Sequence, residues 1–192
     1  MRTFQEATEI YDKIIEEDAC NVTAHKRKAS LCRGKGTPEG LRDAVAAINE
    51  YLTLYPTDAD AWREMADVFL EQQHLEHARK ALEEVVMLAP ANYISHLRLA
   101  DALYTLEEYP TARKYYAQSL ELNPEKNPRA AIGMVLTTAA LDAPKGKAGK
   151  GDETNSALYR ISRDAILTQY DRIPSGAPGA KIAPLVRAWL RA

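Results

Sequence analysis

Alanine and proline recur along this chain at a fixed step of 34 residues. Two sets of positions keep the step independently: Ala44, Ala78 and Ala112 form one set, and Pro56, Pro90 and Pro124 form the other. A fixed period between about 20 and 50 residues is the sequence signature of supersecondary units that stack on one another. The period therefore predicts an array of equal units in place of a single irregular core.

The stretch 59–90 shows what one unit contains. Apolar residues recur at three- and four-residue steps on both sides of a polar break at 71–74, which predicts two amphipathic helices. Because the break is short, the helices must lie antiparallel in a hairpin. Ala66 and Ala78 are expected where the backbones come closest. Three larger side chains are expected to fill the space around them: Trp62, Phe69 and Leu82.

This pattern of a large–small–aromatic first helix, an alanine-led second helix and a closing proline resembles the tetratricopeptide repeat. The resemblance implies an all-α fold, a right-handed α-solenoid of tetratricopeptide helical hairpins with a C-terminal capping helix. An ordinary helical bundle with chance spacing is the alternative. Several positions that keep one period disfavour it.

The predicted solenoid occupies residues 1–141 and opens in mid-repeat. Ala7, Tyr11 and Ile14 match second-helix positions, but no first helix stands before them. An uncovered second helix exposes its apolar face, so we expect the chain to be a trimmed or natural fragment of a longer solenoid. The turn at 34–40 is expected to contain three extra residues, which explains a spacing of 37 at that point.

The repeat pattern stops near residue 142. Residues 142–153 are charged and glycine-rich, which predicts a flexible linker. Residues 154–192 are expected to form a closing helix pair. Its helix at 154–172 would partner a helix at 128–141 that contains Gly133, and a last helix at 182–191 would cover the end of the stack. Four apolar residues are expected to make that cover: Leu185, Val186, Trp189 and Leu190.

Composition excludes several functional classes. The net charge is −2, so nothing indicates bulk attraction to nucleic acid. No apolar run approaches the ~20 residues that span a bilayer, and the N-terminus lacks a signal-peptide core. The two cysteines, Cys20 in a predicted turn and Cys32 on an inward helix position, are expected to be reduced thiols.

We found no pattern that indicates catalysis. His74 and His77 are three residues apart, but no third ligand lies near, whereas zinc needs three or four. The glutamate pairs fall at helix exteriors and turns, where solvation explains them better than acid–base chemistry. We therefore expect no enzyme activity, no catalytic residue, no metal, no cofactor and no small-molecule substrate.

Function is instead expected on the concave face that first helices line in tetratricopeptide arrays. Mixed charges with an apolar end suit a peptide or a partner's helix. The alternative is that these side chains are only solvated. The candidate partner-binding residues are Lys26, Arg33, Arg63, Asp67, Leu97, Asp101 and Tyr104.

One class of tetratricopeptide domain binds chaperones through a clamp of Lys and Asn residues that holds a terminal carboxylate. Lys26 and Arg98 lie near clamp positions here, but Ser30 stands where the first Asn would be and Glu64 occupies another position. A carboxylate beside Glu64 would be repelled. A chaperone-type adaptor that binds acidic C-terminal peptides is therefore the second hypothesis.

Several strings, helix-exterior residues included, are similar to one family, subunit 2 of the endoplasmic reticulum membrane protein complex. They lie at residues 11–18, 25–29, 49–52, 61–66 and 112–120. The family implies a non-catalytic scaffold at the cytosolic face of the endoplasmic reticulum membrane, peripheral to it through partners. It would join membrane subunits, notably 3 and 5, to a soluble subunit 8 or 9, in an assembly that inserts transmembrane segments. The chain departs from the family in lacking its first repeats and in having Ala19 where a turn proline is expected.

Overall fold

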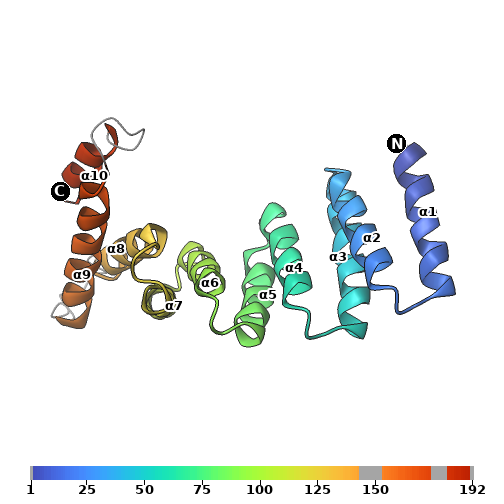
Figure 1. Cartoon of the computed structure of the whole chain (residues 1–192), viewed down its shortest axis with the longest axis horizontal. Helices are drawn as coiled ribbons and strands as arrows, with labels where there is room; N and C mark the ends of the chain where they lie inside the picture. The colour runs from blue at the N-terminus through green and yellow to red at the C-terminus, as the bar shows by residue number, and fades with distance from the viewer. Residues whose placement is uncertain (1, 143–152, 174–180, 191–192) are drawn as a thin grey trace. The chain divides into compact units, whose positions relative to one another are not determined.

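The computed structural model describes residues 2–142, 153–173 and 181–190. These residues contain ten helices and no strand, and their contacts divide the chain into two compact units, Met1–Pro90 and Ala91–Ala192 (Figure 1). Unit 1 comprises α1 (Arg2–Glu17), α2 (Val22–Gly34), α3 (Pro38–Leu54), α4 (Ala59–Glu71) and α5 (Leu75–Leu88). Unit 2 comprises α6 (Tyr93–Thr105), α7 (Tyr109–Leu122), α8 (Pro128–Asp142), α9 (Glu153–Asp171) and α10 (Ala183–Trp189).

The expected hairpins are confirmed. Helix α2 packs against α3, α4 against α5, α6 against α7 and α8 against α9, while α1 packs against α2. Short polar side chains fix where the first helices begin: Asn21, Asp58 and Asn92 are the N-caps of α2, α4 and α6. Each side-chain oxygen accepts a backbone N–H of the first turn, which has no partner inside the helix.

The alanine register is also confirmed. Ala44, Ala78 and Ala112 on the second helices are 0% exposed, as are Ala66 and Ala100 on the first helices. A methyl group at these positions lets the two backbones of a hairpin approach closely. Larger side chains beside the alanines then complete the core.

The turns inside the hairpins share one backbone conformation. Gly36, Gln73 and Glu107 each occupy the middle of a three-residue connection with φ of 64°, 59° and 62°. The prediction that the first of these turns contains three extra residues is wrong, since all three connections are equally long. The extra residues lie in α3, which has 17 residues against 14 in α5, because Thr37 and Pro38 start the helix one turn earlier.

The expectation for Trp62 and Phe69 needs correction, whereas Leu82 is 0% exposed as expected. Trp62 is half-buried and its indole N–H donates to the Pro56 carbonyl at 2.8 Å, so it covers the turn before α4. Phe69 is also half-buried, with its ring centroid 5.2 Å from that of His77. The large apolar side chains that α4 buries fully are two other residues, Met65 and Val68.

Gly133 is confirmed as the small residue of α8. A Cβ atom built there would lie 2.3 Å from Cε1 of Tyr116 on α7. Only a hydrogen on the α-carbon leaves room for the tyrosine ring. The predicted pairing of α8 with the helix at 154–172 is also confirmed, since α9 packs along α8.

Helix α10 covers less than expected. Leu190 is 3% exposed and joins Ala131, Val135 and Ile166 in one apolar cluster, with Val186 packed against it. Leu185 and Trp189 were expected in the same cover, but they are 69% and 43% exposed because they lie on a neighbouring face of this short helix. The predicted linker lies almost wholly outside the described residues.

Cys20 is exposed and Cys32 buried, both as free thiols.

Candidate protein-binding surfaces

The seven predicted contact residues fall into two groups. Lys26, Arg33, Arg63 and Asp67 lie on α2 and α4 of unit 1, and Leu97, Asp101 and Tyr104 lie on α6 of unit 2. Contact with a partner stays a prediction for all seven. We call the first group, with the polar residues that touch or adjoin it on α2 and α4, the α2–α4 surface.

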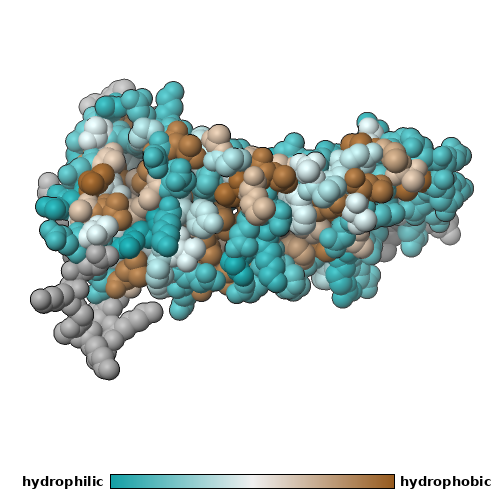
Figure 2. Space-filling model, turned by 90° about the horizontal axis from the view of Figure 1, so that it is seen from below, coloured by the Kyte–Doolittle hydropathy of each residue, from teal (hydrophilic) through white to brown (hydrophobic). Residues whose placement is uncertain are grey.

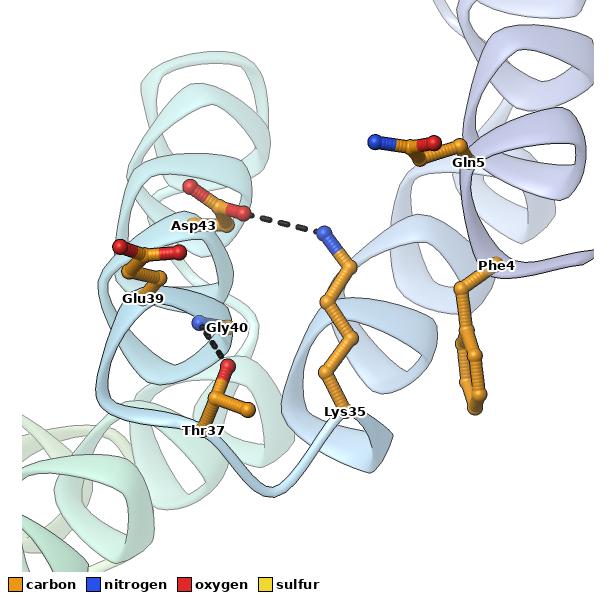
Figure 3. Close-up of a pocket in the computed structure, with 7 residues that line it drawn as sticks. All are labelled: Phe4, Gln5, Lys35, Thr37, Glu39, Gly40 and Asp43. Atoms are coloured by element: carbon orange, nitrogen blue, oxygen red, sulfur yellow. Dashed lines mark hydrogen bonds and ion pairs between the residues drawn. The ribbon is translucent and has the colours of Figure 1, made fainter. Parts of the chain in front are cut away.

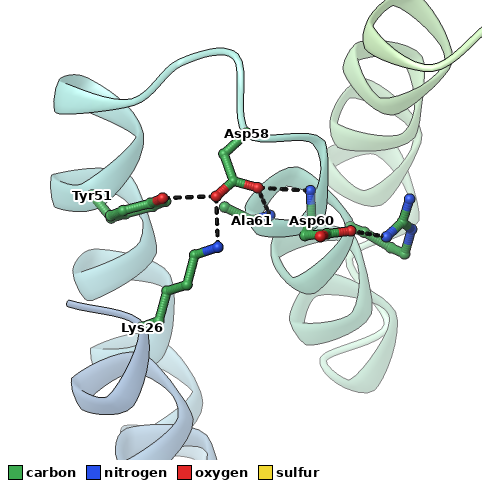
Figure 4. A network of polar contacts seen from close by, with 6 residues as sticks. Lys26, Tyr51, Asp58, Asp60 and Ala61 are labelled. Atoms are coloured by element: carbon green, nitrogen blue, oxygen red, sulfur yellow. Dashed lines mark hydrogen bonds and ion pairs between the residues drawn. The ribbon is translucent and has the colours of Figure 1, made fainter. Parts of the chain in front are cut away.

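Lys26 is held by a network at the start of α4 (Figure 4). Its Nζ lies 2.6 Å from Oδ2 of Asp58, which also accepts the Tyr51 hydroxyl at 2.7 Å. The other Asp58 oxygen accepts the backbone N–H groups of Asp60 and Ala61 at 2.9 and 3.2 Å. The Lys26 ammonium also lies 5.4 Å from the centre of the Tyr51 ring. One carboxylate therefore joins α2, α3 and α4.

Electrostatics favours the ionised form of this carboxylate. Partial burial opposes ionisation of Asp58, but hydrogen bonds from Lys26, Tyr51 and the Ala61 N–H outweigh burial and lower the pKa of Asp58 to about 2. The hydrogen bond to Asp58 correspondingly raises the pKa of Lys26 above its ordinary value, although burial opposes that shift. Lys26 thus has a structural partner, and its side chain is still 41% exposed.

Two further contacts join α2 to α4. The Ser30 hydroxyl donates to Oε1 of Glu64 at 3.4 Å, and the Arg33 guanidinium binds Oε1 of Glu71, with Nε at 3.1 Å. Together with the Lys26–Asp58 pair, they run along both helices at spacings of 32, 34 and 38 residues. Each contact joins a basic or hydroxyl side chain of α2 to a carboxylate at the start of α4 or on it.

The remaining predicted residues of this surface lie on α4. Arg63 forms an ion pair with Asp60 one turn earlier, and Asp67 is half-buried. The surface has an excess of carboxylates over basic groups. Its acidic members are Asp58, Asp60, Glu64, Asp67 and Glu71, and its basic members are Lys26, Arg33 and Arg63.

The three residues of unit 2 differ in exposure. Leu97 is 8% exposed, so it supports α6 from inside and offers little area to a partner. Asp101 accepts the Tyr116 hydroxyl at 2.7 Å and pairs with Arg129 of α8 at 2.8 Å. Tyr104 lies against Tyr109, with 5.4 Å between ring centroids. Ile94, at the start of α6, is 46% exposed and is the apolar residue that remains open on this helix.

Burial changes the chemistry of the tyrosine in this second network. The pKa of Tyr116 is raised, first by burial and then by the hydrogen bond and negative charge of Asp101. The hydroxyl therefore stays protonated and acts as a donor. Like the network at Asp58, it joins successive helices.

A groove in unit 1 lies between α1 and the start of α3 (Figure 3). It has a volume of about 260 Å³, and the ion pair between Lys35 and Asp43, at 3.0 Å, closes one side of it. Phe4 supplies its apolar wall. Small-molecule sites usually have about 300–1,000 Å³ and a few converging polar groups. This groove is smaller, and two of its charged groups, Lys35 and Asp43, are already paired with each other.

Among the described residues, no group of three or more His, Cys, Asp or Glu side chains is placed to hold a metal ion. No helix in the described part of the chain is long and apolar enough to cross a membrane. In the view of Figure 2, hydrophobic side chains reach the surface in separate patches among hydrophilic ones.

Sequence reasoning missed the partners of the predicted residues. Asp58, Tyr51, Glu71 and Arg129 determine how the predicted side chains are held, but none was selected from the sequence. One signal was present for Asp58: it stands directly before a predicted helix, as Asn21 and Asn92 do at the same place in their repeats. No sequence signal marks the other three, because their contacts span separate helices.

The repeated hairpins, with buried alanines at one register and polar contacts between first helices, define a tetratricopeptide-repeat protein. The solved structure of MamA shows the same fold: it superposes with a TM-score of 0.67 at 15% identity, covering 92% of this chain and 90% of that one.

The sequence places the chain in a narrower family than the fold does. The model of the EMC2 TPR-like repeat domain matches residues 2–124, and the chain belongs to that family. ER membrane protein complex subunit 2-A of Xenopus laevis is 31% identical over 168 residues, and subunit 2 of Dictyostelium discoideum is 32% identical over 121. These alignments cover 85% and 62% of this chain but 55% and 37% of the relatives, so the chain spans about half the length of the curated relatives it matches.

Proposed function

We propose that this chain is a non-catalytic scaffold subunit of a membrane-protein insertase complex at the cytosolic face of the endoplasmic reticulum membrane. Its membership of the EMC2 repeat family is the observation that carries the proposal, because the relatives are named as subunits of the ER membrane protein complex. The partners we propose are membrane subunits 3 and 5 and a soluble subunit 8 or 9 of that complex.

The α2–α4 surface is the part of the chain that we assign to a partner. Its cross-helix contacts hold Lys26, Arg33 and Glu64 in fixed positions, and preformed polar groups lose little entropy when an extended segment binds. Most of these groups are still partly exposed, so a partner can exchange their water for its own polar groups. A cytosolic segment of a membrane subunit is the occupant we propose.

The proposal is tested by affinity capture. The immobilised chain is incubated with detergent-solubilised endoplasmic reticulum membranes, and bound proteins are identified by mass spectrometry. We expect subunits 3 and 5 and subunit 8 or 9. Recovery of none of them would discard the proposal.

Matched variants locate the surface. Reversing charge with Arg63→Glu or Asp67→Lys should reduce recovery of these subunits. Lys80→Glu makes the same kind of change at an exposed position of α5 and should leave recovery unchanged. Equal effects of all three variants would show that the contact lies elsewhere.

The alternative is a chaperone-type adaptor for acidic C-terminal peptides, and the α2–α4 surface supports it less. Carboxylates outnumber basic groups there, and Lys26, the basic residue a clamp needs, is paired with Asp58. Titration with an acidic C-terminal peptide tests it. Binding that disappears in Lys26→Ala would favour the adaptor over the scaffold.

A further inference from the structure

Helix α10 is apolar on nearly all sides. Ala183, Val186 and Leu190 face the cluster on α8 and α9, with Ala183 6% and Leu190 3% exposed. On a neighbouring face, three large apolar residues follow one another at steps of three and four. We call them the α10 stripe: Ile182 is 50% exposed, Leu185 69% and Trp189 43%.

Such a helix is ordinarily covered on both sides. Pro184 and Ala188 are exposed beside the stripe, so its neighbours on the helix offer no polar surface either. The polar side chains of the segment 181–190 are Lys181 and Arg187, and both are basic. Exposed apolar patches of this kind mark contact with a protein or a membrane.

Charge distinguishes between these occupants. No acidic residue stands from 172 to the end of the sequence, although the whole chain has a net charge of −2. Arg187 is partly neutralised by an ion pair with Asp171, but its side chain remains 43% exposed. Lys181 is exposed. Because Arg187 turns toward Asp171 of α9, the positive charge beside the stripe comes from Lys181, and it complements an anionic surface.

A second copy of this chain fits less well. Two α10 helices would bring like charges together, and the few side chains of the stripe fall far short of the about 20–30 residues per side that a standard protein interface uses. A lipid surface requires neither a matching shape nor a large area. Apolar and aromatic side chains enter the boundary between headgroups and acyl chains, and basic side chains stay near the phosphates.

We propose that α10 rests on an anionic membrane surface, with Ile182, Leu185 and Trp189 in the interfacial layer and Lys181 near lipid phosphates. This contact is with lipid, so it is independent of the protein partner that we assign to the α2–α4 surface. A single short helix supplies modest affinity, which suits a protein that also reaches the membrane through partners.

Vesicle flotation tests the proposal with the whole chain. We expect binding to phosphatidylcholine vesicles that contain phosphatidylserine, weaker binding to pure phosphatidylcholine vesicles, and a decrease with added salt. Leu185→Ser should weaken binding at least about fivefold, since it removes a buried leucine side chain from the contact. Ile161→Ser on α9 is the matched control, because Ile161 is 66% exposed and lies outside the stripe.

Fluorescence gives a second readout. Trp62→Phe leaves Trp189 as the remaining tryptophan, and its emission should shift to the blue with anionic vesicles. Three outcomes would overturn the proposal: no vesicle binding, equal losses in Leu185→Ser and Ile161→Ser, or a chain dimer in solution that Leu185→Ser dissociates. Circular dichroism checks that each variant keeps its helix content.

Discussion

Units 1 and 2 each bring together a tyrosine hydroxyl, a carboxylate and a basic side chain where successive helices meet, but they place the carboxylate differently. In unit 1 the carboxylate is Asp58, the N-cap of α4, with Tyr51 and Lys26 as partners. In unit 2 it is Asp101, inside α6, with Tyr116 and Arg129. The same three chemical groups thus join helices in both units, once at the start of a helix and once inside one.

The two junctions therefore depend on different residues. In unit 1 the carboxylate has two tasks, because it starts α4 and also joins three helices. In unit 2 the carboxylate does not start a helix. The Tyr116 ring there occupies the space that a side chain at position 133 would fill, so it requires glycine at that position. We therefore expect unit 1 to be most sensitive at the carboxylate and unit 2 at the glycine.

Each unit contains one tryptophan, so the stability of each unit can be measured separately by fluorescence. Trp62 lies in unit 1 and Trp189 in unit 2. Urea unfolding followed by fluorescence, in Trp189→Phe or Trp62→Phe backgrounds, reports the stability of one unit at a time. Different midpoints for the two would also show that the chain does not unfold in a single step.

The largest effect is expected at the glycine of unit 2. Gly133→Ala should lower the free energy of unfolding by about 3 kcal/mol, because the new methyl group overlaps the Tyr116 ring. Gly34→Ala in unit 1 is the control, since its Cβ would meet Phe4 at an ordinary 4.0 Å. This control should be neutral or more stable by up to about 1 kcal/mol. A loss of the same size in both variants would contradict the packing argument.

Removing the two carboxylates should have unequal effects. Asp58→Ala should cost about 2 kcal/mol, since it removes a helix cap and leaves the buried Tyr51 hydroxyl without its acceptor. Asp101→Ala should cost about 1 kcal/mol, because the Tyr116 hydroxyl loses its acceptor, whereas Arg129, whose side chain is 75% exposed, can bind water in place of the lost carboxylate. Urea unfolding of both variants measures the difference between their losses of unfolding free energy. Equal losses would mean that the cap adds nothing to unit 1.

The unit 1 junction should also depend on pH. The pKa of Asp58 is lowered to about 2, below the ~3.9 of an unfolded chain. The ionised carboxylate therefore stabilises the fold fully above about pH 4, and this stabilisation is lost as the pH falls toward 2. Asp58→Asn keeps a capping side chain without the charge. The difference in free energy of unfolding between this variant and the unchanged protein should therefore narrow as the pH falls from about 4 toward 2. A gap that is constant with pH would contradict the assignment.

The smallest effect is expected at the hairpin turns, where the two units are alike. Gln73 in unit 1 and Glu107 in unit 2 have positive φ, which side-chain-bearing residues adopt at a cost. Gln73→Gly and Glu107→Gly should each raise the free energy of unfolding by about 0.5–1 kcal/mol, since glycine adopts this φ without strain. Thermal melting of both variants should show similar small gains.

Much of the fold was predictable, and the reasons are local. The 34-residue period, the buried alanines and the polar caps determine helix order and boundaries within a few residues. The location of the three extra residues was not predictable from spacing, because Thr37 and Pro38 convert an apparent loop into a helical turn. The exposure of Leu185 and Trp189 was missed for another reason: an all-apolar helix has no pattern that tells which side faces the core.

The candidate site was predictable in outline and not in its contacts. Projection of the first helices selected Lys26, Arg33 and Arg63 correctly as surface residues. It also selected Leu97, which the fold buries, because a residue at the edge of a helical face can point to either side. The Lys26–Asp58 and Arg33–Glu71 pairs join residues 32 and 38 apart, and sequence spacing alone does not reveal such contacts.

Site-specific photocrosslinking shows whether the α2–α4 surface touches a subunit of the ER membrane protein complex. A photoreactive residue is placed at position 63 on the α2–α4 surface, and in a second sample at position 80 on α5, before incubation with endoplasmic reticulum membranes. We predict that position 63 crosslinks to a subunit of the ER membrane protein complex and that position 80 does not. Crosslinks to the complex from position 80 alone, or none from either position, would contradict the assignment of this surface.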